Sequence, residues 1–163
     1  MLTDELVAFI HSGVSIYIGS RDAALKPHVT WGWGVIADKD EGTITTYVHE
    51  KESENLRKDI ADNKAIAVAL GSLGTHDAYQ FKGRIASIRK SDQHDYAVQE
   101  IYRKKFFDAL TKEGLPENVA SKLHFKCSIA VTFEVAEIYL STPGPDAGKL
   151  ISSLSKPDDK KGE

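Results

Sequence analysis

The segment from Tyr47 to Lys58 combines a strand, a short polar turn and the start of a helix, and its residue types are those of an anion site. The free backbone N–H groups at a helix N-terminus carry partial positive charge. Lys51 in the turn and Arg57 on the helix add full charges, so this junction is suited to a phosphate group. Three interspersed acids favour the simpler interpretation, a capped helix with a solvated charged face: Glu50, Glu52 and Glu54.

Two glycine-containing segments have the composition of a ligand site. Between Trp31 and Gly34, tryptophans alternate with glycines, and glycines on one strand face admit a flat ligand close to the backbone. A bulge or a tight barrel corner explains these glycines about as well. The loop Gly71–His76 could hold a ligand through backbone amides, although a plain connection between strands is the commoner case. His49 and His76 fall at strand-to-loop transitions, and they are the candidates to test for acid–base chemistry.

Several common catalytic and metal-binding patterns are missing from the sequence. Gly144–Leu150 is similar to a Walker A loop, but three residues separate its glycines where four are required, and Leu150 replaces the metal-binding hydroxyl. The histidines form no metal-binding helical pair, and a single cysteine, Cys127, excludes a thiolate zinc site. Ser20 lacks the glycine-flanked elbow of a hydrolase. We therefore expect no metal site, and the sequence assigns no catalytic residue.

The composition is that of a soluble globular protein. The 163 residues suffice for one domain with a proper core, and 41% of them are hydrophobic and 28% charged. A net charge of -3 gives no electrostatic footprint for nucleic acid or an anionic membrane. The N-terminal sequence MLTDELVAFI has acids where a signal peptide needs positive charge, and no apolar stretch approaches transmembrane length. We expect a cytoplasmic protein without a nucleic-acid or membrane partner.

Hydrophobic periodicity predicts about six strands and two substantial helices. The strands are expected at residues 14–19, 28–35, 43–49, 65–70, 78–88 and 125–140. The first three are joined by short turns, which predicts an antiparallel meander. This pattern indicates an α+β fold, mainly β, built on a closed or nearly closed barrel. Residues 1–150 are predicted to be a single domain, with a polar, flexible C-terminal tail at residues 151–163.

Helical periods appear in four places. A short helix is expected after Thr3, a second from Ser53 to Asn63, and a brief one after Pro116. The longest is predicted to be capped by Ser91 and to carry one apolar stripe, made up of Val98, Ile101, Tyr102, Phe106 and Leu110.

The order of elements and several short phrases resemble the FMN-binding split-barrel superfamily of pyridoxamine 5'-phosphate oxidase-like proteins. The matching phrases lie within residues 3–150: Ile18–Asp22, Pro27–Val29, Asn55–Arg57, Ile66–Val68, Gln80–Arg84 and Pro143–Gly148. The resemblance implies a six-stranded antiparallel split β-barrel with flanking helices. It also implies a homodimer with two FMN sites at the subunit interface.

The same resemblance implies positions for the cofactor-binding residues. Lys51 and Ser53 lie in the turn that holds the flavin phosphate in such proteins, with His49 at its start. Thr30 and Trp31 lie on the strand that flanks the isoalloxazine ring. The remaining two, Tyr79 and Gln80, lie on the strand that gives polar contacts near the ring. The function that follows is an FMN-dependent oxidoreductase acting on a small molecule.

Departures from the family pattern keep other functions open. Thr30 and Val35 stand where true pyridoxamine phosphate oxidases have an arginine and a lysine, and Glu52 replaces a second basic residue of the turn. Each lost charge-assisted bond costs about 1.5–3 kcal/mol, which argues against oxidation of vitamin B6 phosphates. The alternatives are a non-catalytic module that binds haem or another flat cofactor, and a dimeric interaction domain with an empty cleft.

Overall fold

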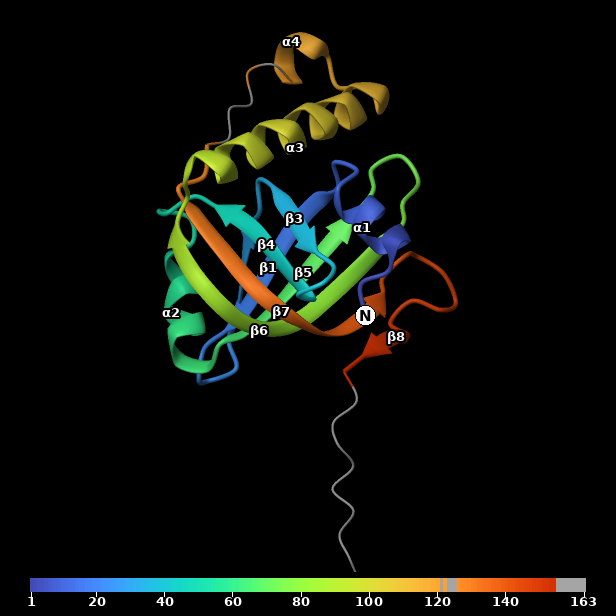
Figure 1. Ribbon diagram of the computed structural model, residues 1–163. Helices are drawn as coiled ribbons and strands as arrows, with labels where there is room; N and C mark the ends of the chain where they lie inside the picture. The colour runs from blue at the N-terminus through green and yellow to red at the C-terminus, as the bar shows by residue number, and fades with distance from the viewer. Residues whose placement is uncertain (121, 123–125, 155–163) are drawn as a thin grey trace, which may run out of the picture.

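The computed structural model describes residues 1–120, 122 and 126–154, which form eight strands and four helices (Figure 1). The strands are β1 (Ser15–Arg21), β2 (Pro27–Trp31), β3 (Val35–Asp38), β4 (Thr43–Val48), β5 (Ala65–Gly71), β6 (Ala78–Lys90), β7 (Ile129–Leu140) and β8 (Leu150–Ser153). The helices are α1 (Asp4–Ile10), α2 (Glu54–Asn63), α3 (Gln93–Lys112) and α4 (Glu117–Ala120).

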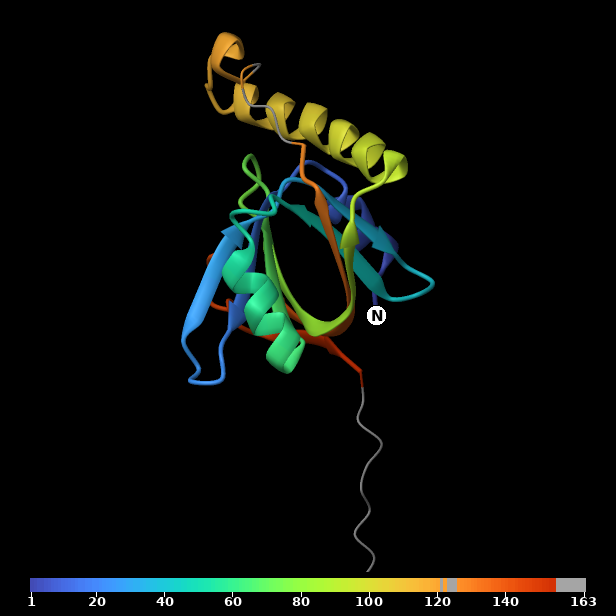
Figure 2. The ribbon, with the colours of Figure 1, turned by 90° about the vertical axis from the view of Figure 1, so that its left-hand side faces the viewer.

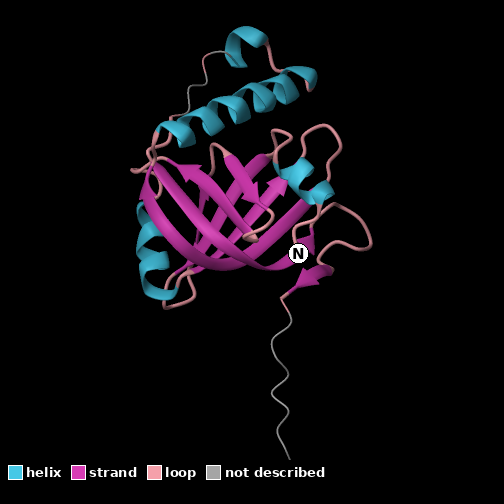
Figure 3. Ribbon diagram, viewed as in Figure 1, coloured by secondary structure: helices cyan, strands magenta, loops and turns pink. Residues whose placement is uncertain are grey.

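All pairs of neighbouring strands are antiparallel, in the order β2-β1-β5-β6-β7-β4-β3, with β8 added to β7. The sheet curls into a barrel whose strands surround an interior, as the side view in Figure 2 shows. Helices flank this sheet, with α3 lying across one end of the barrel (Figure 3). The predicted fold class, a mainly β α+β split barrel with flanking helices, is confirmed. It has eight strands instead of six.

The predicted strand at residues 28–35 is wrong, because two glycines divide it into β2 and β3. A Cβ on Gly32 would collide with the side chain of Ile16 and lie 2.8 Å from Thr46 Oγ1, and Gly34 has a φ of +146°. Between β2 and β3, the N–H of Gly32 donates to β1 and the N–H of Trp33 donates to Tyr47 O on β4 (2.8 Å). The chain therefore crosses here from one edge of the sheet to the other.

This crossing also overturns the predicted meander of the first three strands. β2 pairs with β1, but β4 pairs with β7 and β3 and makes no ladder with β2. A short turn does join β3 to β4, as expected, but the break at the glycines had already moved the chain to the opposite edge. Local spacing could not reveal this, because the partner of β4 comes more than 80 residues later in the sequence.

The core lies inside the barrel, where alternate residues of the strands are buried. β5 shows the alternation most plainly, with Ile66, Val68 and Leu70 buried between half-exposed neighbours. The predicted core face of the last strand is confirmed at Ile129, Val131, Phe133 and Val135.

Cys127 is buried just before β7, and burial, reinforced by the charge of Glu52, raises the pKa of its thiol to about 12. The thiol is therefore a small hydrophobic group.

α3 is fixed over the end of the barrel by two buried polar contacts. The amide of Gln99 exchanges hydrogen bonds with the backbone of Cys127 (3.1 and 2.7 Å), and the hydroxyl of Tyr102 donates to Val14 O (2.8 Å). Two predictions for this helix were wrong. Its N-cap is Asp92, which forms a capping box with Asp95, instead of Ser91. Ile101 is 58% exposed and does not belong to the buried stripe.

The C-terminal end of the described chain adds β8 to the sheet. β8 begins at Leu150, the predicted domain boundary, and pairs with β7 over Glu137–Tyr139. Residues 155–163 of the predicted tail lie outside the described residues. None of the described helices has both the length and the apolar character that crossing a bilayer requires.

Candidate functional site

The turn after β4 lies against β2, which brings Thr30 next to the predicted phosphate-binding residues. Thr30 is only 8% exposed, and its hydroxyl donates to Glu52 O (3.4 Å). The hydroxyl of the N-cap residue Ser53 donates back to Glu50 O (3.2 Å) and does not cap the helix. The first N–H groups of α2 therefore donate no hydrogen bond to the Ser53 side chain, and a helix N-terminus in this state favours an anion.

Arg57 strengthens the positive character of this turn. Its Nη2 donates to Glu50 O (3.0 Å), which holds the guanidinium at the start of α2. Its Nε is buried, with no hydrogen-bond partner among the described residues. A buried guanidinium nitrogen without an acceptor is costly, so an external oxygen ligand would be favourable there.

Two of the three acids that favoured the interpretation as a solvated charged helix, Glu50 and Glu54, are paired with lysines outside the turn. Glu50 accepts from Lys90 (2.7 Å) and Glu54 from Lys58 (2.7 Å). These lysines lower the pKa of both carboxyl groups, so each acid is ionised and its charge is balanced by that of its lysine. Lys51 is exposed in the middle of the turn and has no ion-pair partner among the described residues. Glu52 offsets the charge of Lys51, so the excess of positive charge at the start of α2 comes from Arg57.

The second part of the candidate site is the outer face of the sheet. One row of directly opposed residues crosses four strands, and opposed residues share a face: Trp31, Tyr17, Ala69 and Gln80. The rings of Tyr17 and Trp31 are 4.7 Å apart between centroids, and those of Trp31 and Trp33 are stacked at 5.7 Å. The next row contains Val29, Gly19 and Ala67, so small residues leave the surface beside the aromatic rings open.

This outer face is unusually apolar for a surface. Tyr17 is 41% exposed, Trp31 45% and Val29 70%. Large apolar residues clustered on an accessible sheet face mark a ligand or protein contact site.

Six of the seven predicted cofactor-binding residues fall into two groups. Thr30, His49, Lys51 and Ser53 are brought together around the turn between β4 and α2. Trp31 and Gln80 share the outer face in one row, with Tyr17 and Ala69 between them.

Tyr79 is separated from Gln80, its neighbour on β6, because neighbouring residues of a strand face opposite sides. It packs edge-on against Phe9 of α1, with ring centroids 4.9 Å apart. The second candidate histidine, His76, is exposed in the loop between β5 and β6 and has a φ of +61°.

A cluster that the sequence reasoning missed lies on the other side of Thr30. Asp59 of α2 is 3% exposed and accepts through Oδ2 from Ser20 (2.6 Å) and from His28 Nδ1 (2.8 Å). Burial alone raises the pKa of Asp59, but these two hydrogen bonds outweigh it and lower the pKa. The one signal in the sequence was an acid on the apolar side of α2, beside the buried Leu56 and Ile60.

The fold is shared with several solved structures. HupZ from Group A Streptococcus matches with a TM-score of 0.55 at 18% identity, over 91% of this chain and 100% of that chain. An FMN-binding protein from Syntrophomonas wolfei matches with a TM-score of 0.54 at 9% identity, over 94% and 88%. An F420 reductase matches with a TM-score of 0.53 at 11% identity, over 80% and 93%.

Sequence comparison gives the family. No curated protein sequence matches this chain. The family model described as pyridoxamine 5'-phosphate oxidase matches residues 2–134, which include strands β1 to β6, α1 to α3 and the whole candidate site. The chain belongs to the pyridoxamine 5'-phosphate oxidase family.

Proposed function

We propose that this protein binds FMN and works as a flavin-dependent oxidoreductase on a small molecule. The observation that carries the proposal is the convergence of Thr30, Lys51 and Arg57 on the N-terminus of α2, next to the apolar outer face that contains Trp31. A ligand with a phosphate at one end and a flat ring at the other fits both parts.

The residues present fit the two ends of the flavin. The phosphate would be held by the first N–H groups of α2 and the guanidinium of Arg57, with Lys51 at the rim, while the Thr30 hydroxyl holds the turn in place through Glu52 O. The ring would lie against Trp31, where Gly19 and Ala67 leave room beside the backbone. A bound flavin supplies two-electron transfer, and the protein supplies binding, orientation and electrostatic tuning.

We also propose that two copies of the chain pair through the outer face of the sheet. A ring lying on this face would be covered on one side only, because Tyr17, Val29 and Trp31 are all exposed. A second copy of the chain would cover the other side of the ring and the apolar side chains together. Family membership and the fold shared with an FMN-binding protein support this arrangement.

The test is the absorption spectrum of the purified protein, followed by FMN titration with flavin fluorescence as the readout. We expect a flavin spectrum and FMN binding that raises Tm, since a ligand that binds only the folded state stabilises it. Arg57→Met should weaken FMN binding about tenfold to a hundredfold, because a charge-assisted hydrogen bond contributes about 1.5–3 kcal/mol. Lys104→Ala, on the exposed surface of α3, is the matched control and should bind normally.

Two results would contradict the proposal. A Soret band in place of a flavin spectrum would favour the alternative, a non-catalytic module that binds haem. Unchanged FMN affinity in both Arg57→Met and the double variant Lys51→Ala/Ser53→Ala would show that the phosphate is bound elsewhere.

A further inference from the structure

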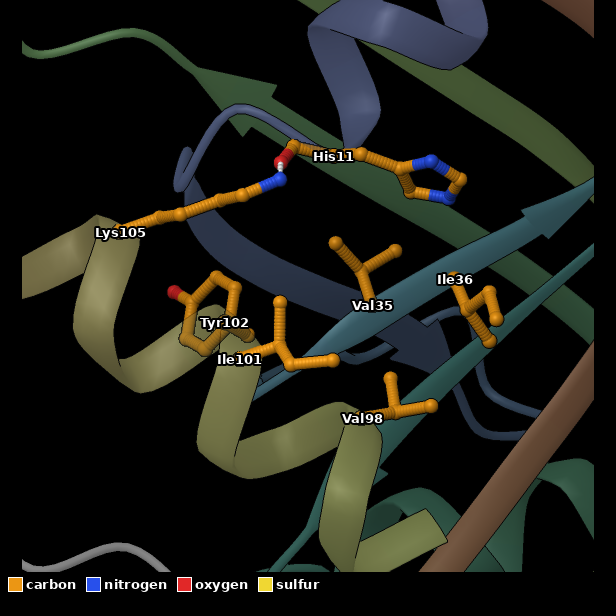
Figure 4. A pocket seen from close by; sticks show the side chains of 7 residues that line it. All are labelled: His11, Val35, Ile36, Val98, Ile101, Tyr102 and Lys105. Atoms are coloured by element: carbon orange, nitrogen blue, oxygen red, sulfur yellow. Dashed lines mark hydrogen bonds between the residues drawn. The ribbon is translucent and has the colours of Figure 1, made fainter. Parts of the chain in front are cut away.

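A separate crevice of about 190 Å³ lies between α3 and β3, at the end of α1. Its walls come from three elements that are distant in sequence, and Figure 4 shows the aliphatic side chains of β3 and α3 facing one another across it. It shares no residue with the proposed flavin site. The lining residues are His11, Val35, Ile36, Val98, Ile101, Tyr102 and Lys105.

The interior of the crevice is apolar. Four of the seven lining residues are valine or isoleucine, and Tyr102 offers only its ring because its hydroxyl donates to Val14 O (2.8 Å). Ile101 lies at the opening of the crevice and is 58% exposed. Tyr102, the next residue of α3, is buried. An exposed branched aliphatic residue beside an open apolar crevice is a favourable contact for a hydrocarbon group.

The polar rim carries one positive charge. The ammonium of Lys105 donates one hydrogen bond to the backbone oxygen of His11 (2.7 Å), which leaves two of its three protons for other acceptors (Figure 4). His11 accepts the N–H of Ala37 at Nε2 (3.0 Å), and burial together with Lys105 lowers the pKa of its ring, so the imidazole is neutral. None of the described lining residues is acidic. The rim therefore favours an anion.

We propose that this crevice binds a monocarboxylate with a short hydrocarbon chain. The carboxylate would accept from the Lys105 ammonium, and the chain would lie between β3 and α3. The volume of the crevice is larger than that needed by several water molecules, so a short hydrocarbon chain has room between its walls. An aliphatic amine would meet the same walls, but its charge would be repelled by Lys105.

The experiment titrates the full chain with butanoate, hexanoate and octanoate, followed by the backbone amide shifts of Ile36, Ile101 and Lys105. We expect shifts at these residues and a gain in affinity of about fourfold per added methylene until the crevice is full, from about 0.8 kcal/mol per buried methylene. Lys105→Met should weaken octanoate binding about twofold to fivefold, the range of an exposed ion pair, and leave 1-octanol binding unchanged.

Matched variants keep the test independent of folding. Ile101→Glu places a carboxylate at the opening on an exposed side chain, and it should abolish octanoate binding while Tm stays close to that of the wild type. Ile101→Leu and Lys104→Met are the controls and should bind octanoate normally. Saturating FMN should leave octanoate affinity unchanged, which separates this proposal from the flavin site.

Three outcomes would overturn the proposal. The first is the absence of amide shifts at Ile36, Ile101 and Lys105 with about 10 mM octanoate, a concentration that reveals a Kd as weak as about 10 mM. The second is octanoate binding that survives Ile101→Glu. The third is an equal response of octanoate and 1-octanol to Lys105→Met, which would show that the ammonium does not recognise the carboxylate.

Discussion

His28 and Asp59 are 31 residues apart in the sequence, and Nδ1 of His28 lies 2.8 Å from Oδ2 of Asp59. A carboxylate only accepts, so the proton of this hydrogen bond is on the imidazole. The same oxygen accepts from Ser20, and the three residues tie β1, β2 and α2 together. Thr30 follows His28 on the same face of β2, so this link fixes its place against the start of α2.

Asp59→Asn should lower the free energy of unfolding by about 1.5–3 kcal/mol at pH 7, because hydrogen bonds to a buried charged group are lost. The native pKa of Asp59 is lowered, so its contribution is fully present above about pH 4, the ordinary pKa of an aspartate, and is lost as the pH falls through the native pKa. The difference between wild type and variant should therefore shrink in acid. Urea unfolding at pH 7, 5 and 3 measures it.

The exposed Asp62 on the same helix provides the control for this prediction. Asp62→Asn should change stability little at any of these pH values. A constant gap in stability between wild type and Asp59→Asn from pH 7 to pH 3 would mean that Asp59 does not stabilise the fold through its charge.

Asp95 should be a second source of acid sensitivity. Burial raises its pKa, but hydrogen bonds from Arg89, from the Asp92 N–H (2.8 Å) and from Tyr47 (3.0 Å) outweigh burial and lower the pKa to about 2. An ordinary pKa of 3.8 reduced to about 2 corresponds to about 2 kcal/mol of stability. That amount should be present above pH 4 and lost progressively toward pH 2.

Asp95→Asn tests this by denaturant unfolding between pH 7 and pH 2. The variant should be less stable at pH 7 and should lose less stability than the wild type on acidification. Asp108→Asn, an exposed position on α3, should follow the wild-type profile. Identical acid profiles for Asp95→Asn and wild type would contradict the assignment.

Gly32→Ala should destabilise the barrel at the point where the chain changes edges. The added Cβ would collide with the side chain of Ile16 and crowd that of Thr46, and both of these side chains are buried. Overpacking of this kind costs about 1–3 kcal/mol, and the urea midpoint measures it. Gly74→Ala is the control, because its nearest contact is 3.4 Å away and no unusual φ is required. Equal midpoints for the two variants would show that the crossing tolerates a side chain.

If two copies of the chain pair through the outer face of the sheet, acidic residues on that face should reduce the mass of the protein in solution from dimer to monomer. The double variant Val29→Glu/Trp31→Glu should sediment as a monomer of 18.0 kDa, whereas the wild type should sediment as a dimer. Val119→Glu alters an exposed apolar residue on α4 and should remain dimeric. Analytical ultracentrifugation distinguishes the species, and a monomeric wild type would remove the proposed pairing.

The sequence by itself determined most of the elements and the local pattern that each carries, although it did not show the break between β2 and β3 or strand β8. Helix α1 begins at its predicted cap, Thr3, which accepts from the Leu6 N–H, and the period-two burial of β5 follows its apolar alternation. Such features depend on residues a few positions apart, and capping and strand alternation act over that range. The same local reading identified Lys51 and Arg57 at the start of α2 as cations at a helix N-terminus.

Only the tertiary structure decided which elements meet. The glycines between β2 and β3 read equally well as a continuous strand and as a corner, and the choice depended on Ile16, Thr46 and Tyr47, which approach them from two other strands. The partners of Asp59 and the walls of the crevice beside Lys105 are likewise assembled from segments tens of residues apart. Contacts of this kind depend on chain crossing and register, and a local pattern carries no information on either.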